Sequence, residues 1–436
     1  MSPVTIIQTI LVVALGAAVL LVRHRAGAYR AAYGLIWLAY VAHIGSAVAQ
    51  VLLIQYVYGG GDAVFYLQRG AEWARLLSYD SSLYLGDVVG IVLQREDVFL
   101  PATVTKFGTS TATMQGLTAI LCWLLSPSLL VVGMVSSVLA FHGQLAIYNV
   151  AVARLREVSP RALAAAVLLV PSAVFWTSSL VKEAIATAFL GALVSAFHHL
   201  LRGRPMRSTP GLAVGALGLG LVKPYVLFAF VISAVAWWYW EQALKRSGGR
   251  RMEIRPGALV LGFLGCSLLL IVLGRLFPRY ALERVVEEAA RLQAVGATTG
   301  GGSDYALAAT TSASAAGQFV LAPLAAFTAL YRPLLIEVHN PLALIAALEN
   351  TAFLGLTVSV IWRRGLRQTL VRVAENPLLV FSAVLVAILA VAVGLASTNL
   401  GTLSRYRVPL VPFFALLLLV SYRATAAGAS ATPRSG

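Results

Sequence analysis

An acidic residue follows three glycines where the second long apolar run of the sequence ends. The glycines are Gly59 to Gly61, and Asp62 comes directly after them. A carboxylate on such a loosened backbone could act as a general base and take a proton from a hydroxyl group, and loss of water would raise its pKa toward neutrality. The alternative is that Asp62 caps a helix starting at Ala63, because aspartate is favoured there. We expect Tyr66 to line the same site.

Cations recur at four later points, each beside a proline, a tyrosine or an acid. Any one of them can be an ordinary contact with lipid headgroups. Together they would form a cationic pocket, since guanidinium forks suit phosphate or pyrophosphate and a low dielectric strengthens the contacts. The candidate binding residues at these points are Lys182, Glu183, Lys223, Arg332, Glu337, Arg405, Tyr406 and Arg407.

One further acid, Glu349, falls inside an apolar run. An ionised carboxylate is costly there, so Glu349 needs a partner or a wet cavity, which Asn350 beside it could share. The sequence contains no Walker loop, no zinc-type cluster of His and Cys and no Ser-His-Asp spacing.

The composition indicates which elements must position these residues. The chain has 436 residues, of which 59% are hydrophobic and 11% charged, with a mean hydropathy of +0.84. Roughly 25% of the residues of an ordinary soluble domain are charged. Runs of about 20 apolar residues, each able to cross a bilayer, recur along the chain. The sequence therefore predicts an all-α polytopic membrane protein and excludes a cytosolic enzyme.

We predict about eleven transmembrane helices. The first run has its basic residues after it rather than before it, which is typical of a retained anchor and not of a secretory signal. Its N-terminus then lies outside, and an odd number of spans places the C-terminus inside. The predicted spans are Val4–Val22, Tyr33–Tyr58, Leu129–Ala153, Ala162–Phe175, Ala184–Leu201, Gly211–Leu221, Tyr225–Trp240, Gly257–Gly274, Pro341–Trp362, Pro377–Ala396 and Val408–Tyr422.

The net charge of +16 is a topology signal. The excess of Lys and Arg falls in the short loops that this arrangement assigns to the inside, as the positive-inside rule expects. Because these residues are scattered among short loops, we do not expect the protein to bind nucleic acid.

Two outer segments, residues 59–128 and 275–340, are longer than a connection needs to be. Each contains an apolar stretch that is too short or too interrupted to span comfortably, at Met114–Leu125 and at Phe319–Leu330. We expect both stretches to be helices in the outer interface, beside a cavity; the alternative, that one of them spans, would invert everything downstream. Residues 1–422 then form a single transmembrane domain, and residues 423–436 a disordered cytoplasmic tail.

The polar motifs resemble those of the integral-membrane glycosyltransferases of the GT-C fold. The resemblance lies in the acid and tyrosine after an early span, in the long outer loop with an interfacial helix, and in Pro-Ser-x-x-Phe-Trp-x-Ser-Ser-x-x-Lys-Glu, which ends at Lys182 and Glu183. Tyr331-Arg332-Pro333 followed by Glu337, and residues 404–409, Ser-Arg-Tyr-Arg-Val-Pro, look like later elements of bacterial members.

The resemblance implies a sugar donor carried on a polyprenyl phosphate, and transfer to a glycan or lipid acceptor at the outer face of the bacterial inner membrane. Asp62 would be the base for the acceptor hydroxyl, and Lys182, Lys223, Arg332 and Arg405 would hold the donor phosphate. Many members carry a second acid beside the first, whereas Asp62 is flanked by Gly61 and Ala63. The sequence therefore leaves open whether a divalent cation acts as a cofactor.

Two alternatives stay open at this point. A polysaccharide polymerase, like those of O-antigen assembly, would use repeat units linked to polyprenyl pyrophosphate and would depend more on Arg405 and Arg407 than on Asp62. A secondary transporter or lipid-linked glycan flippase would usually show inverted repeats and broken helices near the midplane, and no internal repeat is evident in the sequence.

Overall fold

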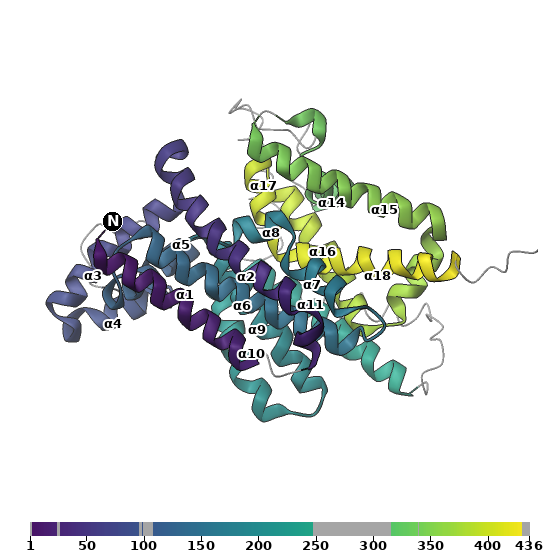
Figure 1. The fold of residues 1–436 in the computed structure, drawn as a ribbon, viewed down its shortest axis with the longest axis horizontal. Coiled ribbons are helices and arrows are strands. Elements are labelled where there is room, and N and C mark those ends of the chain that lie inside the picture. Colours follow the sequence, from purple (N-terminus) through teal and green to yellow (C-terminus); the bar gives the residue numbers. More distant parts are fainter. Residues whose placement is uncertain are drawn as a thin grey trace, which may run out of the picture. The chain divides into compact units, whose positions relative to one another are not determined.

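The chain is helical in the parts that the computed structural model describes, which are residues 2–23, 27–95, 98, 108–246, 315–338 and 340–429. No β-strand occurs within these ranges. The elements, drawn in Figure 1, are α1 (Pro3–Arg23), α2 (Gly27–Leu53), η1 (Ile54–Tyr58), α3 (Asp62–Tyr79), α4 (Ser81–Val92), α5 (Ser110–Leu124), α6 (Leu129–Arg154), α7 (Pro160–Leu168), α8 (Pro171–Trp176), α9 (Lys182–Leu201), α10 (Pro205–Val222), α11 (Pro224–Arg246), α14 (Ala315–Tyr331), η3 (Leu335–Glu337), α15 (Pro341–Ala374), α16 (Pro377–Ala396), α17 (Leu400–Tyr406), η4 (Val408–Leu410) and α18 (Val411–Ala429).

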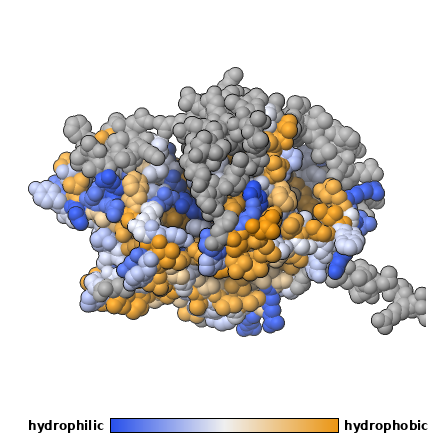
Figure 2. Space-filling view, turned by 90° about the horizontal axis from the view of Figure 1, so that it is seen from above, coloured by the Kyte–Doolittle hydropathy of each residue, from blue (hydrophilic) through white to orange (hydrophobic). Residues whose placement is uncertain are grey.

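Eight helical segments of the described ranges are long and apolar enough to cross a membrane. Each overlaps one of the predicted spans, so the prediction of an all-α, multi-pass membrane protein is confirmed. Apolar side chains cover much of the surface visible in Figure 2, as expected for helices that face lipid.

Three predicted spans are not among these eight. Ala162–Phe175 is divided between α7 and α8, because Pro171 keeps the backbone of the residue before it extended and ends α7. Gly211–Leu221 lies within α10, which has 18 residues. Gly257–Gly274 lies outside the described residues. The total of about eleven spans stays a prediction.

The chain divides into two compact units. Unit 1 comprises Met1–Ala153 and Ser159–Leu227, and unit 2 comprises Arg154–Val158 and Phe228–Gly436. Each unit is a bundle of helices with its own core, and each contains some of the residues singled out from the sequence.

Glycines allow the helices of unit 1 to approach closely. A Cβ atom on Gly215 of α10 would lie 2.6 Å from Leu193 Cγ of α9, so these two antiparallel helices pack with little space between them. A Cβ atom on Gly143 of α6 would lie 2.5 Å from the Thr187 carbonyl oxygen of α9. Small residues at such crossings are the usual means by which membrane helices gain packing contacts.

The helices α3, α4 and α5 form a separate layer of unit 1 around Trp73 and Leu77. Asp80 caps α4 by accepting hydrogen bonds from the Ser82 and Leu83 amides. The Ser82 side chain first, and then these amides, hold the pKa of Asp80 below its usual value. The helix predicted at Met114–Leu125 is present as α5, and α3 and α4 pack along it. Its location in the membrane interface stays a prediction.

Unit 2 is built around α14, α15, α16 and α18. The rings of Trp237, Phe381 and Phe413 pack in series, with centroid distances of 5.1 and 5.6 Å. The stretch predicted at Phe319–Leu330 lies within α14, which packs along α16. The long helix α15 is interrupted at Gly365, whose φ of +73° is readily adopted only by glycine.

Candidate functional site

A buried ion pair lies in unit 1, at the end where α9 begins and α10 ends. Lys223 Nζ is 2.7 Å from Glu183 Oε1 and donates a hydrogen bond to the Tyr225 hydroxyl at 3.0 Å. The exposed fraction is 4% for the Lys223 side chain and zero for that of Glu183. Burial by itself would lower the pKa of the Lys223 ammonium, but Glu183 and Tyr225 outweigh burial and hold this pKa above its usual value.

The helical hairpin of α9 and α10 explains why these two residues meet. Glu183 is the second residue of α9, and Lys223 is the first residue after α10. Because the two helices are antiparallel and pack closely, the start of one lies beside the end of the other. Pro224 follows Lys223 and restricts it to an extended conformation, which ends α10 and starts α11.

Lys182 extends this cluster toward the start of α5. Its ammonium donates hydrogen bonds to Ser110 Oγ at 2.9 Å and to Thr111 Oγ1 at 3.1 Å. The side chain is half-buried. Lys182, Glu183 and Lys223, three of the residues selected from the sequence, therefore lie in one region of unit 1. The hydroxyls of Ser110 and Thr111 belong to it as well, although sequence reasoning did not select them.

The segment before Lys182 is held by polar side chains of two other helices. The Thr177 hydroxyl donates to the Ala173 carbonyl at 2.7 Å. The same oxygen lies 3.4 Å from His43 Nε2 of α2 and 3.5 Å from Gln144 Nε2 of α6. His43, Gln144 and Thr177 have no exposed surface. Sequence reasoning missed this polar triad; the only signal was that each is a polar residue within or beside an apolar run.

Asp62 is exposed and is the first residue of α3. The residue at the N-cap position is Gly61, with a φ of +119°, so the expectation of a helix that starts at Ala63 with Asp62 as its cap was wrong by one position. An aspartate in the first turn still interacts favourably with the helix dipole. Tyr66, four residues later in α3, is buried, with 2% of its surface exposed.

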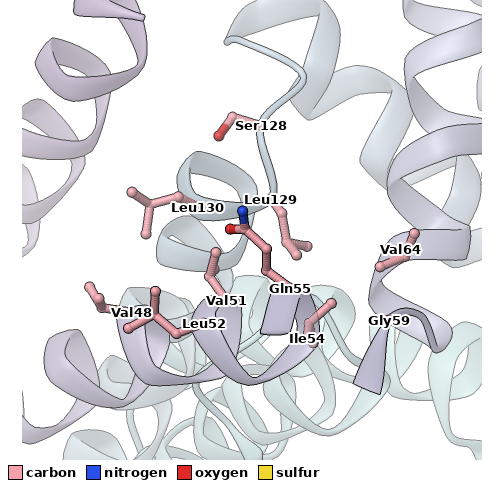
Figure 3. Close-up of a pocket in the computed structure, with 10 residues that line it drawn as sticks. All are labelled: Val48, Val51, Leu52, Ile54, Gln55, Gly59, Val64, Ser128, Leu129 and Leu130. Carbon is pink, nitrogen blue, oxygen red and sulfur yellow. The ribbon is translucent and has the colours of Figure 1, made fainter. Parts of the chain in front are cut away.

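An apolar pocket of about 470 Å³ lies beside the three glycines that precede Asp62, and Gly59 lines it (Figure 3). Its volume falls within the range of small-molecule sites, roughly 300–1,000 Å³. Gly59 and Val64, on either side of Asp62 in the sequence, both line the pocket, and Gln55 places an amide in it. The lining residues are Val48, Val51, Leu52, Ile54, Gln55, Gly59, Val64, Ser128, Leu129 and Leu130.

The remaining selected residues lie in unit 2. Both carboxylate oxygens of Glu337 accept hydrogen bonds from the Arg332 guanidinium, and Oε2 also accepts one from the Leu334 amide at 2.8 Å. This fork closes the turn between α14 and α15. About a fifth of each of the two side chains is exposed.

Arg407 forms a second buried ion pair. Its Nη2 atom is 3.3 Å from Glu349 Oε1, and its Nη1 atom is 3.4 Å from the Arg332 carbonyl oxygen. The exposed fraction is 1% for the Arg407 side chain and 7% for that of Glu349. Asn350 donates to the Pro333 carbonyl at 3.1 Å. The structure thus supplies the partner that the position of Glu349 in an apolar run requires.

Arg405 and Tyr406 lie next to this pair, at the end of α17. The Arg405 guanidinium carbon is 5.6 Å from the centroid of the Tyr406 ring, and both side chains are half-buried. The structure therefore gathers Arg332, Glu337 and Arg407 in unit 2. That all the selected cations face one pocket stays a prediction.

Among the described residues, no group of three His, Cys, Asp or Glu side chains is placed to hold a metal ion. A divalent cation as cofactor stays a prediction of the sequence. Comparisons of the chain with protein-family models, with curated proteins and with solved structures found no match.

Proposed function

We propose that this protein is an integral-membrane glycosyltransferase. It transfers a sugar from a polyprenyl-phosphate donor to a glycan or lipid acceptor at the outer face of a bacterial inner membrane. The observation that carries the proposal is the exposed Asp62 carboxylate, which lies in the sequence between two residues that line an apolar pocket. A lipid-linked substrate needs an apolar surface for its chain beside polar groups for its head.

In the proposed reaction, Asp62 takes the proton of the acceptor hydroxyl. The acceptor oxygen then forms a bond to the anomeric carbon of the donor sugar. The bond between that carbon and the phosphate oxygen breaks, and its electron pair leaves with the polyprenyl phosphate. General-base assistance of this kind typically contributes about 10²–10⁴-fold to the rate.

The structure separates the selected cations by accessibility. Lys223 and Arg407 are enclosed beside carboxylates, so we assign each of them to holding the fold of its own unit. Lys182 is partly exposed and belongs to unit 1, which also contains Asp62, and we propose it as a ligand of the donor phosphate. The burial of Arg407 also favours the transferase over a polymerase, which would need this residue to bind pyrophosphate.

A second candidate function is transport or flipping of a lipid-linked glycan. It is favoured by the broken helix α7–α8 and by the polar triad of His43, Gln144 and Thr177 beside it. Transporters often bind their substrates at discontinuous helices near the midplane of the membrane.

The experiment that tests the transferase is sugar transfer by the purified protein in vesicles. The donors are synthetic polyprenyl-phosphate sugars carrying a radioactive label, offered as a panel with lipid and oligosaccharide acceptors. We expect labelled product with at least one pair, and a loss of about 100-fold or more in Asp62→Asn, because an amide cannot take the proton.

The matched control is Asp87→Asn, which removes another acid of the same predicted loop and should leave transfer unchanged. Full activity of Asp62→Asn would contradict the assignment of Asp62 as the general base. Movement of labelled donor across the vesicle membrane without any covalent product would favour the transporter instead.

A further inference from the structure

The long helix α15 extends beyond the thickness of a membrane. Its part before the kink, from Pro341 to Arg364, would measure roughly 36 Å at 1.5 Å per residue, which exceeds the roughly 30 Å of a hydrocarbon core. Gly365 then interrupts the helix, and the ribbon changes direction near the end of α18 (Figure 1). Residues 366–374, the post-kink segment, must therefore lie at or beyond a membrane surface if α15 spans.

This end of α15 exposes large apolar side chains. Trp362, just before the kink, is 87% exposed, and Leu366 and Leu370 are 61% and 56% exposed. The two leucines are four residues apart and so lie on one face of the helix. Exposed apolar side chains at the level of the headgroups are typical of helices that lie in the membrane interface.

Three arginines accompany these apolar residues. Arg363, Arg364 and Arg367 form a basic patch around the kink, and two of them, Arg363 and Arg367, are exposed. The Arg363 guanidinium lies 5.5 Å from the centroid of the Tyr422 ring. In the described part of the chain, no carboxylate is within ion-pairing distance of these three arginines. By contrast, Arg372 pairs with Glu375 at 2.7 Å.

The far end of the post-kink segment is fixed to unit 2. The Trp240 indole donates to the Ala374 carbonyl at 2.6 Å, and Arg372 also reaches Glu157 at 3.3 Å. These contacts hold the end of the segment, so the exposed leucines and the basic patch keep one orientation. A surface held in this way needs little ordering when a partner binds to it.

We propose that the basic patch and the exposed face of the post-kink segment bind the anionic phospholipid headgroups of one membrane leaflet. The positive charge matches the negative surface, and the leucines and Trp362 enter the boundary between headgroups and acyl chains. This interaction is independent of the proposed sugar transfer.

The test uses an environment-sensitive fluorescent label on Leu370→Cys, in a background with Cys122→Ala and Cys266→Ala. The protein is reconstituted in vesicles of phosphatidylcholine alone or with a third of phosphatidylglycerol. We expect the label to be protected from acrylamide, an uncharged aqueous quencher, only in the anionic vesicles. Each arginine near an anionic surface contributes roughly fivefold, so replacing all three by glutamine should weaken the docking roughly 100-fold.

Two controls separate this interaction from other causes. Arg202, Arg204 and Arg207 are exposed where α9 ends and α10 begins. Their replacement by glutamine removes the same charge and should leave the protection unchanged. A label on Leu348→Cys, which is exposed on α15 itself, should be protected in both kinds of vesicle. High salt should expose the label at position 370, because it screens exposed charges.

Three results would overturn the proposal. Equal quenching at position 370 in both kinds of vesicle would show that the surface does not bind the headgroups. Protection that survives loss of the three arginines would assign the contact to apolar burial alone. Protection in detergent without lipid would mean that protein, such as a second copy of the chain, covers the segment.

Discussion

Two cations that the sequence marked as phosphate ligands are enclosed beside carboxylates. Lys223 pairs with Glu183, and Arg407 pairs with Glu349. Taking both charges of such a pair out of water costs about as much as their attraction returns, but removing one partner leaves a charge that nothing compensates. We therefore interpret these pairs as parts that fix the ends of helices, and the more exposed cations as the groups that meet a ligand.

At the residue scale, Glu183→Gln should destabilise the folded protein by about 3–5 kcal/mol, the usual cost of breaking a buried ion pair from one side. Thermal unfolding in detergent measures this change. The double variant Glu183→Gln with Lys223→Met removes both charges and should recover a large part of the loss. A single variant as stable as the parent would show that the pair carries no such role.

The pH dependence of this contribution follows from the raised pKa of Lys223. A raised folded-state pKa gives stability that is fully present below the unfolded value of about 10.4 and is lost as the pH rises through the folded value. The difference in unfolding temperature between the parent and Lys223→Met should therefore be constant from pH 7 to pH 9 and shrink only in strongly alkaline solution.

At the scale of elements, the polar triad fixes the break between α8 and α9. One hydroxyl, that of Thr177, faces a nitrogen of His43 and a nitrogen of Gln144. The backbone leaves the helical conformation over residues 177–181 and re-enters it at Lys182. The triad thereby holds the start of the segment that leads into α9 and to Lys182 and Glu183.

Thr177→Val keeps the shape of the side chain but removes the oxygen that the three residues share. We expect a loss of about 1–3 kcal/mol in stability, because the buried Gln144 amide loses its acceptor, and a lower rate of sugar transfer. Ser178→Ala is the matched control: its hydroxyl donates within its own turn, to the Val174 carbonyl at 2.6 Å. Equal effects of the two substitutions, measured by thermal unfolding, would contradict a special role for Thr177.

At the scale of the whole molecule, long-range contacts join segments that the charge pattern assigns to the same side. In unit 1, Arg161 donates to the Ala31 carbonyl, both in segments predicted inside. In unit 2, Arg154 pairs with Glu241, and Arg372 with Glu157, again among segments predicted inside. Lys182 and Ser110, which share a hydrogen bond, fall in segments predicted outside. Each of these pairings joins segments predicted on one side, and the order of crossings stays a prediction.

The predicted orientation can be tested with reporter fusions. A green fluorescent protein fused after the last residue should fluoresce, and alkaline phosphatase at the same point should be inactive, because we expect the C-terminus inside. A fusion within the loop at Gly203 should behave in the same way, whereas one at Ser126 should show the opposite pattern. Active phosphatase at the C-terminus would contradict the predicted orientation.

The class of the protein and the ends of most of its long helices could be predicted from the amino-acid sequence. Apolar runs of bilayer length can bury their backbone polar groups only as helices, so the runs alone predict α1, α2, α6 and α16. The composition leads to the same class, because so few charged residues cannot cover the surface of a soluble protein of this size.

Which polar residues contact one another could not be predicted without the folded structure. Glu183 and Lys223 are 40 positions apart and are joined because α9 and α10 fold back on each other at glycines. Glu349 contacts Arg407, and His43 contacts Thr177, across similarly long separations in the sequence. A local sequence pattern shows that a polar residue lies in an apolar segment and needs a partner. Which residue is the partner depends on how the helices pack, and no single segment encodes that packing.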